Sequence, residues 1–158
     1  MQSDITLQRL SAEDPNAAVV AGWIFEAWGH LHPGLTLEQA IDRTKAKCGQ
    51  AGVPSIFVAT QGAVPVATAS LVADDMSIRH ELTPWLASVF VLPKWRGQGI
   101  ASALVRRVEA EATASGFDRF YLYTPDQQAL YRQLGWQDVE RLEYRGENVT
   151  VMSRQMEL

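Results

Sequence analysis

The segment VFVLPKWRGQGIASALVRRVEAEA, residues Val89–Ala112, joins a largely apolar run to a helical pattern. The apolar run at 86–92 predicts a buried strand, and Pro93 ends that strand because proline lacks an amide hydrogen. After Gly99 the apolar residues recur at helical spacing, which predicts an amphipathic helix. Gly97 and Gly99 therefore occupy the turn between a strand and a helix.

This turn has the features of an anion-binding site. The first amides of a helix lack intrahelical acceptors, and the helix dipole is positive at the same end. Without side chains at Gly97 and Gly99, a phosphate can approach the main chain closely. The glycines alone would equally suit a tight turn that needs them only for its dihedral angles. Basic residues surround the turn although the formal net charge of the chain is -4, and this favours a polyanion as the ligand. These basic residues are Lys94, Arg96, Arg106 and Arg107.

Two common phosphate-binding motifs do not fit this turn. A P-loop requires lysine followed by serine or threonine after the second glycine, where this chain has Ile100 and Ala101. A dinucleotide fingerprint requires glycine or alanine at Ser102 and an acidic residue at the end of the next strand. Asp118 has about the right separation but precedes that strand. A nicotinamide-dependent reductase is therefore a weak alternative.

Two motifs resemble a known family. Arg96–Ala101, which reads RGQGIA, resembles the Q/R-x-x-G-x-G/A signature of the GNAT superfamily of N-acetyltransferases. Ala129–Trp136, which reads ALYRQLGW, resembles the A-x-LY-x-x-LG-F/W segment of the same family, in the expected order and separation. The tail from Tyr144 to Met152 is also similar to the closing hairpin of many members.

The resemblance implies an α+β (mixed α/β) fold, in which helices flank a central, mostly antiparallel, twisted sheet. Local patterns agree with the order βααβββαβαββ that it implies. Thr36 and Gln39 form a capping box before one helix, and Asp14 followed by Pro15 opens another. The predicted helices are 15–28, 36–48, 100–115 and 127–134, and the predicted strands are 5–9, 56–60, 64–72, 85–92, 119–123, 138–144 and 148–156.

The bulk composition is that of one ordinary globular domain covering 1–158, with 47% hydrophobic and 20% charged residues. The lone Cys48 excludes an internal disulfide and favours a reducing cytoplasm. The start of the chain does not resemble a leader, and no apolar run approaches the roughly 20 residues of a membrane span. The acidic balance gives no general footprint for nucleic acid. We expect a cytoplasmic protein that binds neither membranes nor nucleic acid.

The resemblance implies that acetyl-coenzyme A is the cosubstrate and that no metal is required. In the family, two strands separate and leave backbone groups that bind the pantetheine arm, and unpaired strand amides need such a partner. These groups carry over to Val89, Phe90 and Val91, and the pyrophosphate would lie on the turn. The predicted residues of the turn are Arg96, Gly97, Gln98, Gly99, Ile100, Ala101 and Ser102.

Tyr131 matches the tyrosine of the family motif and is the predicted general acid. A phenol with a pKa near 10 could protonate a departing thiolate of broadly similar basicity. The oxyanion donor would be a main-chain amide near Phe90. The alternative role for Tyr131 is packing in a short helix.

The general base is less defined, because the predicted strand 85–92 lacks the glutamate that many members carry there. A water chain could serve instead of a single base. The loop 124–127 also lacks the asparagine common in the family. The candidates around the acceptor site are Glu26, His30, Asp74, Asp75, His80 and Glu81. If these carboxylates gathered at the acceptor, they would attract a small cationic primary amine or an exposed peptide N-terminus.

We therefore expect an N-acetyltransferase that transfers the acetyl group directly to a primary amine in a ternary complex. A route through an acetylated Cys48 is disfavoured because that residue is remote in sequence from both motifs. The alternative is a catalytically inactive module of the same fold, which binds coenzyme A or recognises a partner through its tryptophans. Such a module would typically have lost Tyr131 or the glycine turn. A homodimer formed through the final strands is also compatible with the resemblance.

Overall fold

The computed structural model describes residues 4–156, and its elements follow the predicted order. Two short 3-10 helices, η1 (Gly29–Leu31) and η2 (Pro93–Trp95), are added to it. The helices are α1 (Asn16–Trp28), α2 (Leu37–Ala46), α3 (Ile100–Ala114) and α4 (Gln128–Gln133). The strands are β1 (Ile5–Arg9), β2 (Ser55–Gln61), β3 (Val64–Val72), β4 (Trp85–Val91), β5 (Arg119–Thr124), β6 (Gln137–Tyr144) and β7 (Glu147–Gln155).

All seven strands form one sheet, in the order β1-β2-β3-β4-β5-β7-β6. Every neighbouring pair is antiparallel except β4 and β5, which are parallel. These two strands pair at a single position, Trp85 with Tyr121, and then diverge. The mostly antiparallel α+β fold predicted from the sequence is confirmed, and its one parallel pair opens the sheet in the middle.

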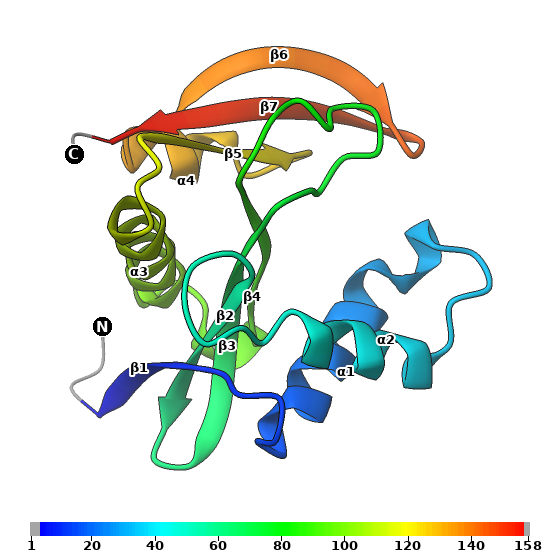
Figure 1. The fold of residues 1–158 in the computed structure, drawn as a ribbon, viewed down its shortest axis with the longest axis vertical. Helices are drawn as coiled ribbons and strands as arrows, with labels where there is room; N and C mark the ends of the chain where they lie inside the picture. Colours follow the sequence, from blue (N-terminus) through cyan, green and yellow to red (C-terminus); the bar gives the residue numbers. More distant parts are fainter. Residues whose placement is uncertain (1–3, 157–158) are drawn as a thin grey trace.

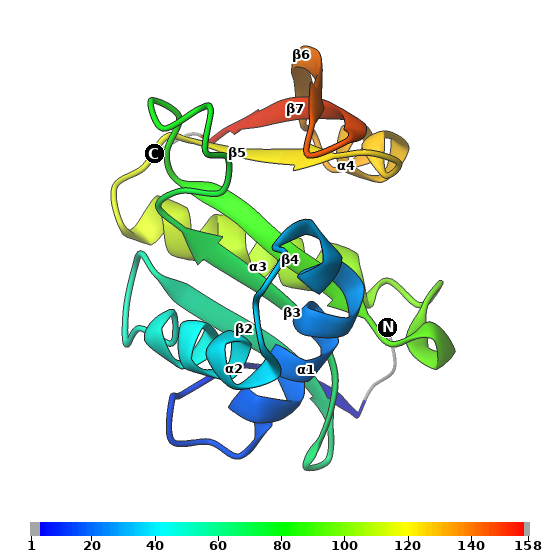
Figure 2. The ribbon, with the colours of Figure 1, turned by 90° about the vertical axis from the view of Figure 1, so that its right-hand side faces the viewer.

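Helices cover both faces of the sheet. Figure 1 shows α3 on one side and α1 with α2 on the other, and Figure 2 views the sheet from the α1–α2 side. The main core lies on the α3 face, where Leu104 and Val108 of α3 join Phe57, Leu86 and Phe120 of the strands. No helix within residues 4–156 is long and apolar enough to cross a membrane.

The local signals that open the helices form hydrogen bonds in the structure, although α1 begins at Asn16, with Pro15 rather than Asp14 at its N-cap position. The Thr36 hydroxyl accepts from the Gln39 amide at 3.1 Å, and the Gln39 side chain accepts from the Thr36 amide at 3.0 Å, which completes the capping box. The Asp14 carboxylate accepts from the Asn16 amide at 2.8 Å at the start of α1. Helix α2 ends at Ala46, two residues before the predicted end.

A buried carboxylate fixes α3 against the first strands. Glu111 accepts from Arg9 at 2.7 Å, from Arg107 at 3.2 Å and from the Gly52 amide at 2.7 Å. Burial alone would raise the pKa of Glu111, but these donors outweigh it and hold the pKa below its usual value. The carboxylate therefore stays charged at neutral pH. Its contacts hold the helix whose N-terminus forms part of the site described next.

Candidate functional site

The divergence of β4 from β5 leaves main-chain groups of β4 without a strand partner on one edge. The Leu92 amide donates to the Val66 carbonyl of β3 at 3.0 Å. Because alternate residues of a strand direct their N–H and C=O groups to opposite edges, Val89 and Val91 face the gap toward β5. A register shift in the β3–β4 pairing accompanies Ser88, whose φ is 54°. The half-buried end of β4 therefore presents groups that a ligand could bind.

Phe90 differs from its two neighbours. Its position opposite Thr68 directs its amide toward β3 rather than into the gap. Its ring lies on the α1 side, with ring centroids 5.8 Å from Trp23 and 6.2 Å from Trp28. Of the three backbone positions predicted for the pantetheine arm, Val89 and Val91 face the gap and Phe90 contributes an aromatic surface.

The glycine turn follows β4 at the N-terminus of α3. Gly97 and Gly99 have φ values of 77° and 79°, in the left-handed region that favours glycine. A Cβ atom built at either position would meet no heavy atom within 4 Å, so both lie beside open space. The Ala103 amide donates to the Gly99 carbonyl at 3.1 Å. The helical amides before Ala103 have no carbonyl group of the helix to which they could donate. Those amides, from Ile100 to Ser102, could hold phosphate oxygens.

Arg96 links this turn to β4. Its Nε donates to the Val91 carbonyl at 2.9 Å, and its guanidinium lies 5.8 Å from the centre of the Phe90 ring. The side chain remains exposed, so its other nitrogens can meet an anion at the turn. The carbonyl groups of Val89 and Val91 both face the gap, and Arg96 already occupies the one at Val91.

Tyr131 lies in α4 and is 6% exposed. Its ring packs against Trp136 with centroids 6.0 Å apart, within the core that also contains Leu104 of α3. Within the described residues its hydroxyl has no hydrogen-bond partner. Burial, and to a lesser extent Asp126, raises the pKa of Tyr131 to about 12, above the value near 10 expected from the sequence. The phenol is therefore neutral throughout the physiological range.

Four of the six candidates for the acceptor site lie in the loop between β3 and β4, and the other two lie in α1 and η1. Glu26 of α1 and His30 of η1 are exposed, as is Glu81 in the loop between β3 and β4. Asp74 and His80 are also exposed and form an ion pair with each other at 3.3 Å. Of the six, only Asp75 is partly buried rather than exposed.

Asp75 is partly buried in the loop that joins β3 to β4. Burial raises its pKa to about 7, and the charges of Lys47 and Arg145 oppose that shift. The same carboxylate raises the pKa of Tyr123, which burial already holds above its usual range. Asp75 therefore interacts electrostatically with Tyr123, which lies near the end of β5, a strand that borders the gap. A carboxylate with this pKa can take up and release a proton at neutral pH.

Tyr144 holds this loop in place. Its hydroxyl accepts from the Ser77 amide at 3.0 Å, and Met76 beside it is 1% exposed. The Tyr144 ring also contacts Tyr123 edge-on, with centroids 5.4 Å apart. The site residues expected from the sequence do not include Tyr123, Tyr144 or their neighbour Arg145. The alternation of Tyr121 and Tyr123 along β5 was a signal that aromatic residues share one face.

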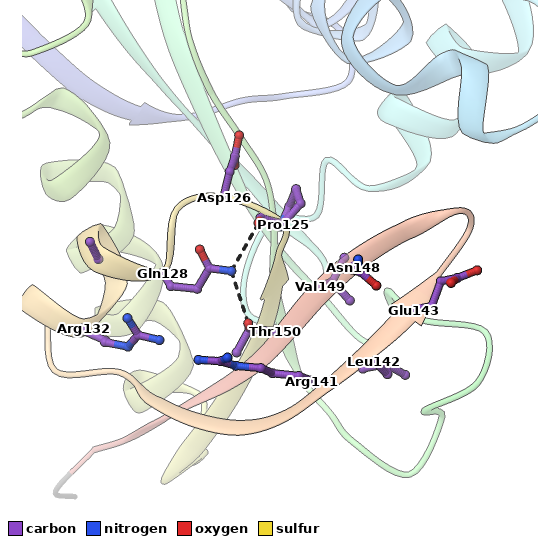
Figure 3. Close-up of a pocket in the computed structure, with 11 residues that line it drawn as sticks. Pro125, Asp126, Gln128, Arg132, Arg141, Leu142, Glu143, Asn148, Val149 and Thr150 are labelled. Atoms are coloured by element: carbon purple, nitrogen blue, oxygen red, sulfur yellow. Dashed lines mark hydrogen bonds between the residues drawn. The ribbon is translucent and has the colours of Figure 1, made fainter.

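Two pockets are lined in part by residues of the β6–β7 hairpin. The larger, of about 630 Å³, lies between α4 and the strongly curved β6, where the Gln128 amide donates to Pro125 and Thr150 (Figure 3). The smaller, of about 410 Å³, lies between the α1–α2 connection and the β6–β7 turn. Its lining residues are His32, Pro33, Gly34, Leu35, Gln39, Arg43 and Arg145. Among residues 4–156, no three His, Cys, Asp or Glu side chains are grouped so that they could hold a metal ion.

Known structures share this architecture. An N-acetyltransferase from Staphylococcus aureus is similar with a TM-score of 0.74 and 18% identity, over 98% of this chain and 100% of that chain. A GNAT family acetyltransferase from Streptococcus pneumoniae gives 0.72 and 14%, over 97% and 99%. A GNAT family acetyltransferase from Elizabethkingia anophelis, solved with acetyl-CoA bound, gives 0.65 and 14%, over 98% and 100%. At these identities the likeness shows the fold.

The sequence itself also matches a family model. The model describes the acetyltransferase (GNAT) family, and it matches residues 19–136. The matched segment runs from α1 through Trp136. It therefore includes the divergence of β4 from β5, the glycine turn and Tyr131.

Proposed function

Because the chain belongs to the acetyltransferase (GNAT) family, we propose that it transfers an acetyl group from acetyl-coenzyme A to a primary amine. The observation that carries the proposal is the divergence of β4 from β5, which leads directly into the glycine turn at the N-terminus of α3. This arrangement offers main-chain groups for an extended amide-bearing chain and helix amides for phosphates within one continuous segment.

The residues fit the cosubstrate at both ends of that segment. Val89 and Val91 would bond the pantetheine arm through their main chain, and the amides that begin α3 would hold the pyrophosphate. Gly97 and Gly99 leave room for close approach, and Arg96 adds a positive charge beside it. The structure from Elizabethkingia anophelis, which has the same fold, was solved with acetyl-CoA bound.

Acetyl-coenzyme A supplies a thioester, whose C–S bond breaks as a C–N bond forms to the amine nitrogen. Within this chain, we assign Asp75 as the base that takes a proton from the amine, directly or through water. Tyr131 would give its proton to the departing sulfur. An amide of β4 that faces the gap, at Val89 or Val91, would donate to the carbonyl oxygen as it gains negative charge.

Cys48 does not suit a covalent route. Its thiol is half-buried and donates to the Thr44 carbonyl at 3.3 Å. Burial, aided by the charges of Glu13 and Asp14, raises its pKa and so disfavours the reactive thiolate. These features support direct transfer in a ternary complex.

We expect Gly99→Glu to weaken acetyl-coenzyme A binding by roughly fivefold to a thousandfold. A carboxylate at the start of α3 would repel a phosphate about 4 Å away by about 1–4 kcal/mol. Gly99→Ala is the matched control, because it carries the same backbone strain at positive φ without the charge. Isothermal titration of both variants, after circular dichroism shows that each is folded, measures the difference.

Titration of the wild-type protein with two ligands also separates the proposed function from that of a dinucleotide-dependent enzyme. The wild-type protein should bind acetyl-coenzyme A and show no saturable heat with NADH. Equal affinities of Gly99→Glu and Gly99→Ala for acetyl-coenzyme A would contradict the assignment of the turn to the pyrophosphate.

A further inference from the structure

We propose that the amine acceptor carries a carboxylate, and that the smaller pocket, lined by His32, Arg43 and Arg145, binds it. The inference rests on the proposed function for its amine half. It adds the chemical class of the acceptor, an amino acid or a similar amino carboxylate.

Two arginines, Arg43 and Arg145, line this pocket, and Lys47 lies near it without lining it. Arg43 and Lys47 lie about one helical turn apart at the end of α2, and Arg145 reaches the pocket from the β6–β7 turn. Within residues 4–156, no carboxylate lies within ion-pair distance of any of the three. Elsewhere in this acidic chain such pairing is common, and the arginines that pair with carboxylates are Arg9, Arg79, Arg107, Arg132, Arg141 and Arg154.

The positive charges around the pocket affect the pKa of His32, a histidine that lines it. Burial lowers the pKa of His32, and the charges of Arg145, Arg43 and Lys47 lower it further. The pocket therefore resists an added positive charge. An anion would be attracted by the same field, and two guanidinium groups provide the planar donor geometry that carboxylates accept.

Contacts connect residues around the pocket to both strands that border the gap, β4 and β5. Arg145 donates to the Leu31 carbonyl at 3.0 Å and lies 5.2 Å from the centre of the Tyr144 ring. Tyr144 in turn contacts Tyr123 of β5. On the other wall, Leu31 ends the turn that follows Trp28, whose ring contacts Phe90 of β4.

Asp75 belongs to the β3–β4 loop, which Ser77 joins to Tyr144, the neighbour of Arg145 in the pocket. Its carboxylate interacts electrostatically with Lys47 and Arg145 and also with Tyr123 of β5. An amino carboxylate could therefore place its carboxylate on the arginines and its amine beside Asp75. This arrangement narrows the small primary amine expected from the sequence to one that also carries a carboxylate.

The test uses amines that differ only by a carboxylate. Tyrosine with tyramine, tryptophan with tryptamine, and lysine with cadaverine form such pairs. We expect kcat/KM to be about 10- to 100-fold higher for the carboxylated member of at least one pair, the range for hydrogen bonds to a charged group. Rates are compared per concentration of free amine across a pH series, since the carboxylate also changes the pKa of the amine.

Variants connect that preference to the pocket. Arg43→Gln and Arg145→Asn should reduce it to within about threefold of unity, because each removes donors to the carboxylate. Asn tolerates the positive φ of 51° at position 145. Lys45→Gln is the matched control, since it removes one positive charge from an exposed position of α2 that does not line the pocket. This variant should keep the full preference.

An equilibrium measurement separates the inference from the proposed function. Calorimetry with N-acetyltyrosine and N-acetyltyramine, and with the acetylated members of the other pairs, measures binding without turnover. Tighter binding of a carboxylated product, lost in Arg43→Gln and kept in Lys45→Gln, would support the pocket even if no amine were acetylated. Equal binding of both members of every pair, or no binding of either, would overturn the inference. Acetylation without a carboxylate preference would overturn it and leave the proposed function standing.

Discussion

Tyr131→Phe is expected to lower kcat by about 10² to 10⁴, the usual contribution of a general acid, and to leave the affinity for acetyl-coenzyme A unchanged. The substitution removes only the hydroxyl, which has no hydrogen-bond partner within residues 4–156. The ring and its packing against Trp136 are kept, so the fold should not change. Steady-state kinetics and calorimetry on the same preparation measure the two quantities.

The pKa of Tyr131 makes a further prediction about pH. Since burial raises it to about 12, the phenol stays protonated, and it should add no descending limb to the profile of kcat below about pH 11. Tyr121→Phe is the matched control, because its ring packs on Trp85 where β4 and β5 are still paired. Unchanged turnover in Tyr131→Phe, with the chemical step shown to limit the rate, would exclude the role of general acid.

Asp75→Asn is expected to lower kcat/KM by about 10² to 10⁴, because the amide cannot take the proton of the amine. In the wild-type protein the burial-raised pKa of about 7 means that Asp75 is mostly protonated below this pH and ionised above it. Activity should therefore rise as the pH increases through about 7. The variant should lose that step and keep only the rise caused by deprotonation of the amine itself.

Asp74→Asn is the matched control for this experiment. Asp74 is the neighbouring carboxylate, but it is exposed and its partner is His80. Its substitution should leave both the rate and the pH profile within about twofold of the wild type. Similar losses in both variants, or an unaltered pH step in Asp75→Asn, would show that Asp75 is not the base.

The sequence was sufficient for those parts of the fold that depend on neighbours along the chain. The capping box of Thr36 and Gln39 and the termination of β4 before Pro93 depend on residues within a few positions, and the structure agrees with both. The glycine turn also lies where the apolar run changes to the helical pattern. Each of these signals acts through local hydrogen bonding or backbone geometry.

The candidate site was harder to predict because its contacts join distant segments. The choice of Asp75 over five other acidic or histidine side chains depends on the path of the β3–β4 loop. That path is held by the contact between Ser77 and Tyr144, which are 67 residues apart in sequence. The basic pocket depends on the contact between Arg145 and Leu31, which are 114 residues apart. The backbone direction of Phe90 likewise follows from the register shift near Ser88, which no local pattern indicates.

The most direct test of the proposed function is product analysis after incubation with acetyl-coenzyme A and a mixture of amines and amino acids. We expect mass spectrometry to show an amine that has gained one acetyl group, with one free thiol released for each amide formed. The intact protein should carry no acetyl group at any time in the reaction. Thiol release without an acetylated amine, or an acetylated protein that forms before the product and then decays, would contradict direct transfer to an amine.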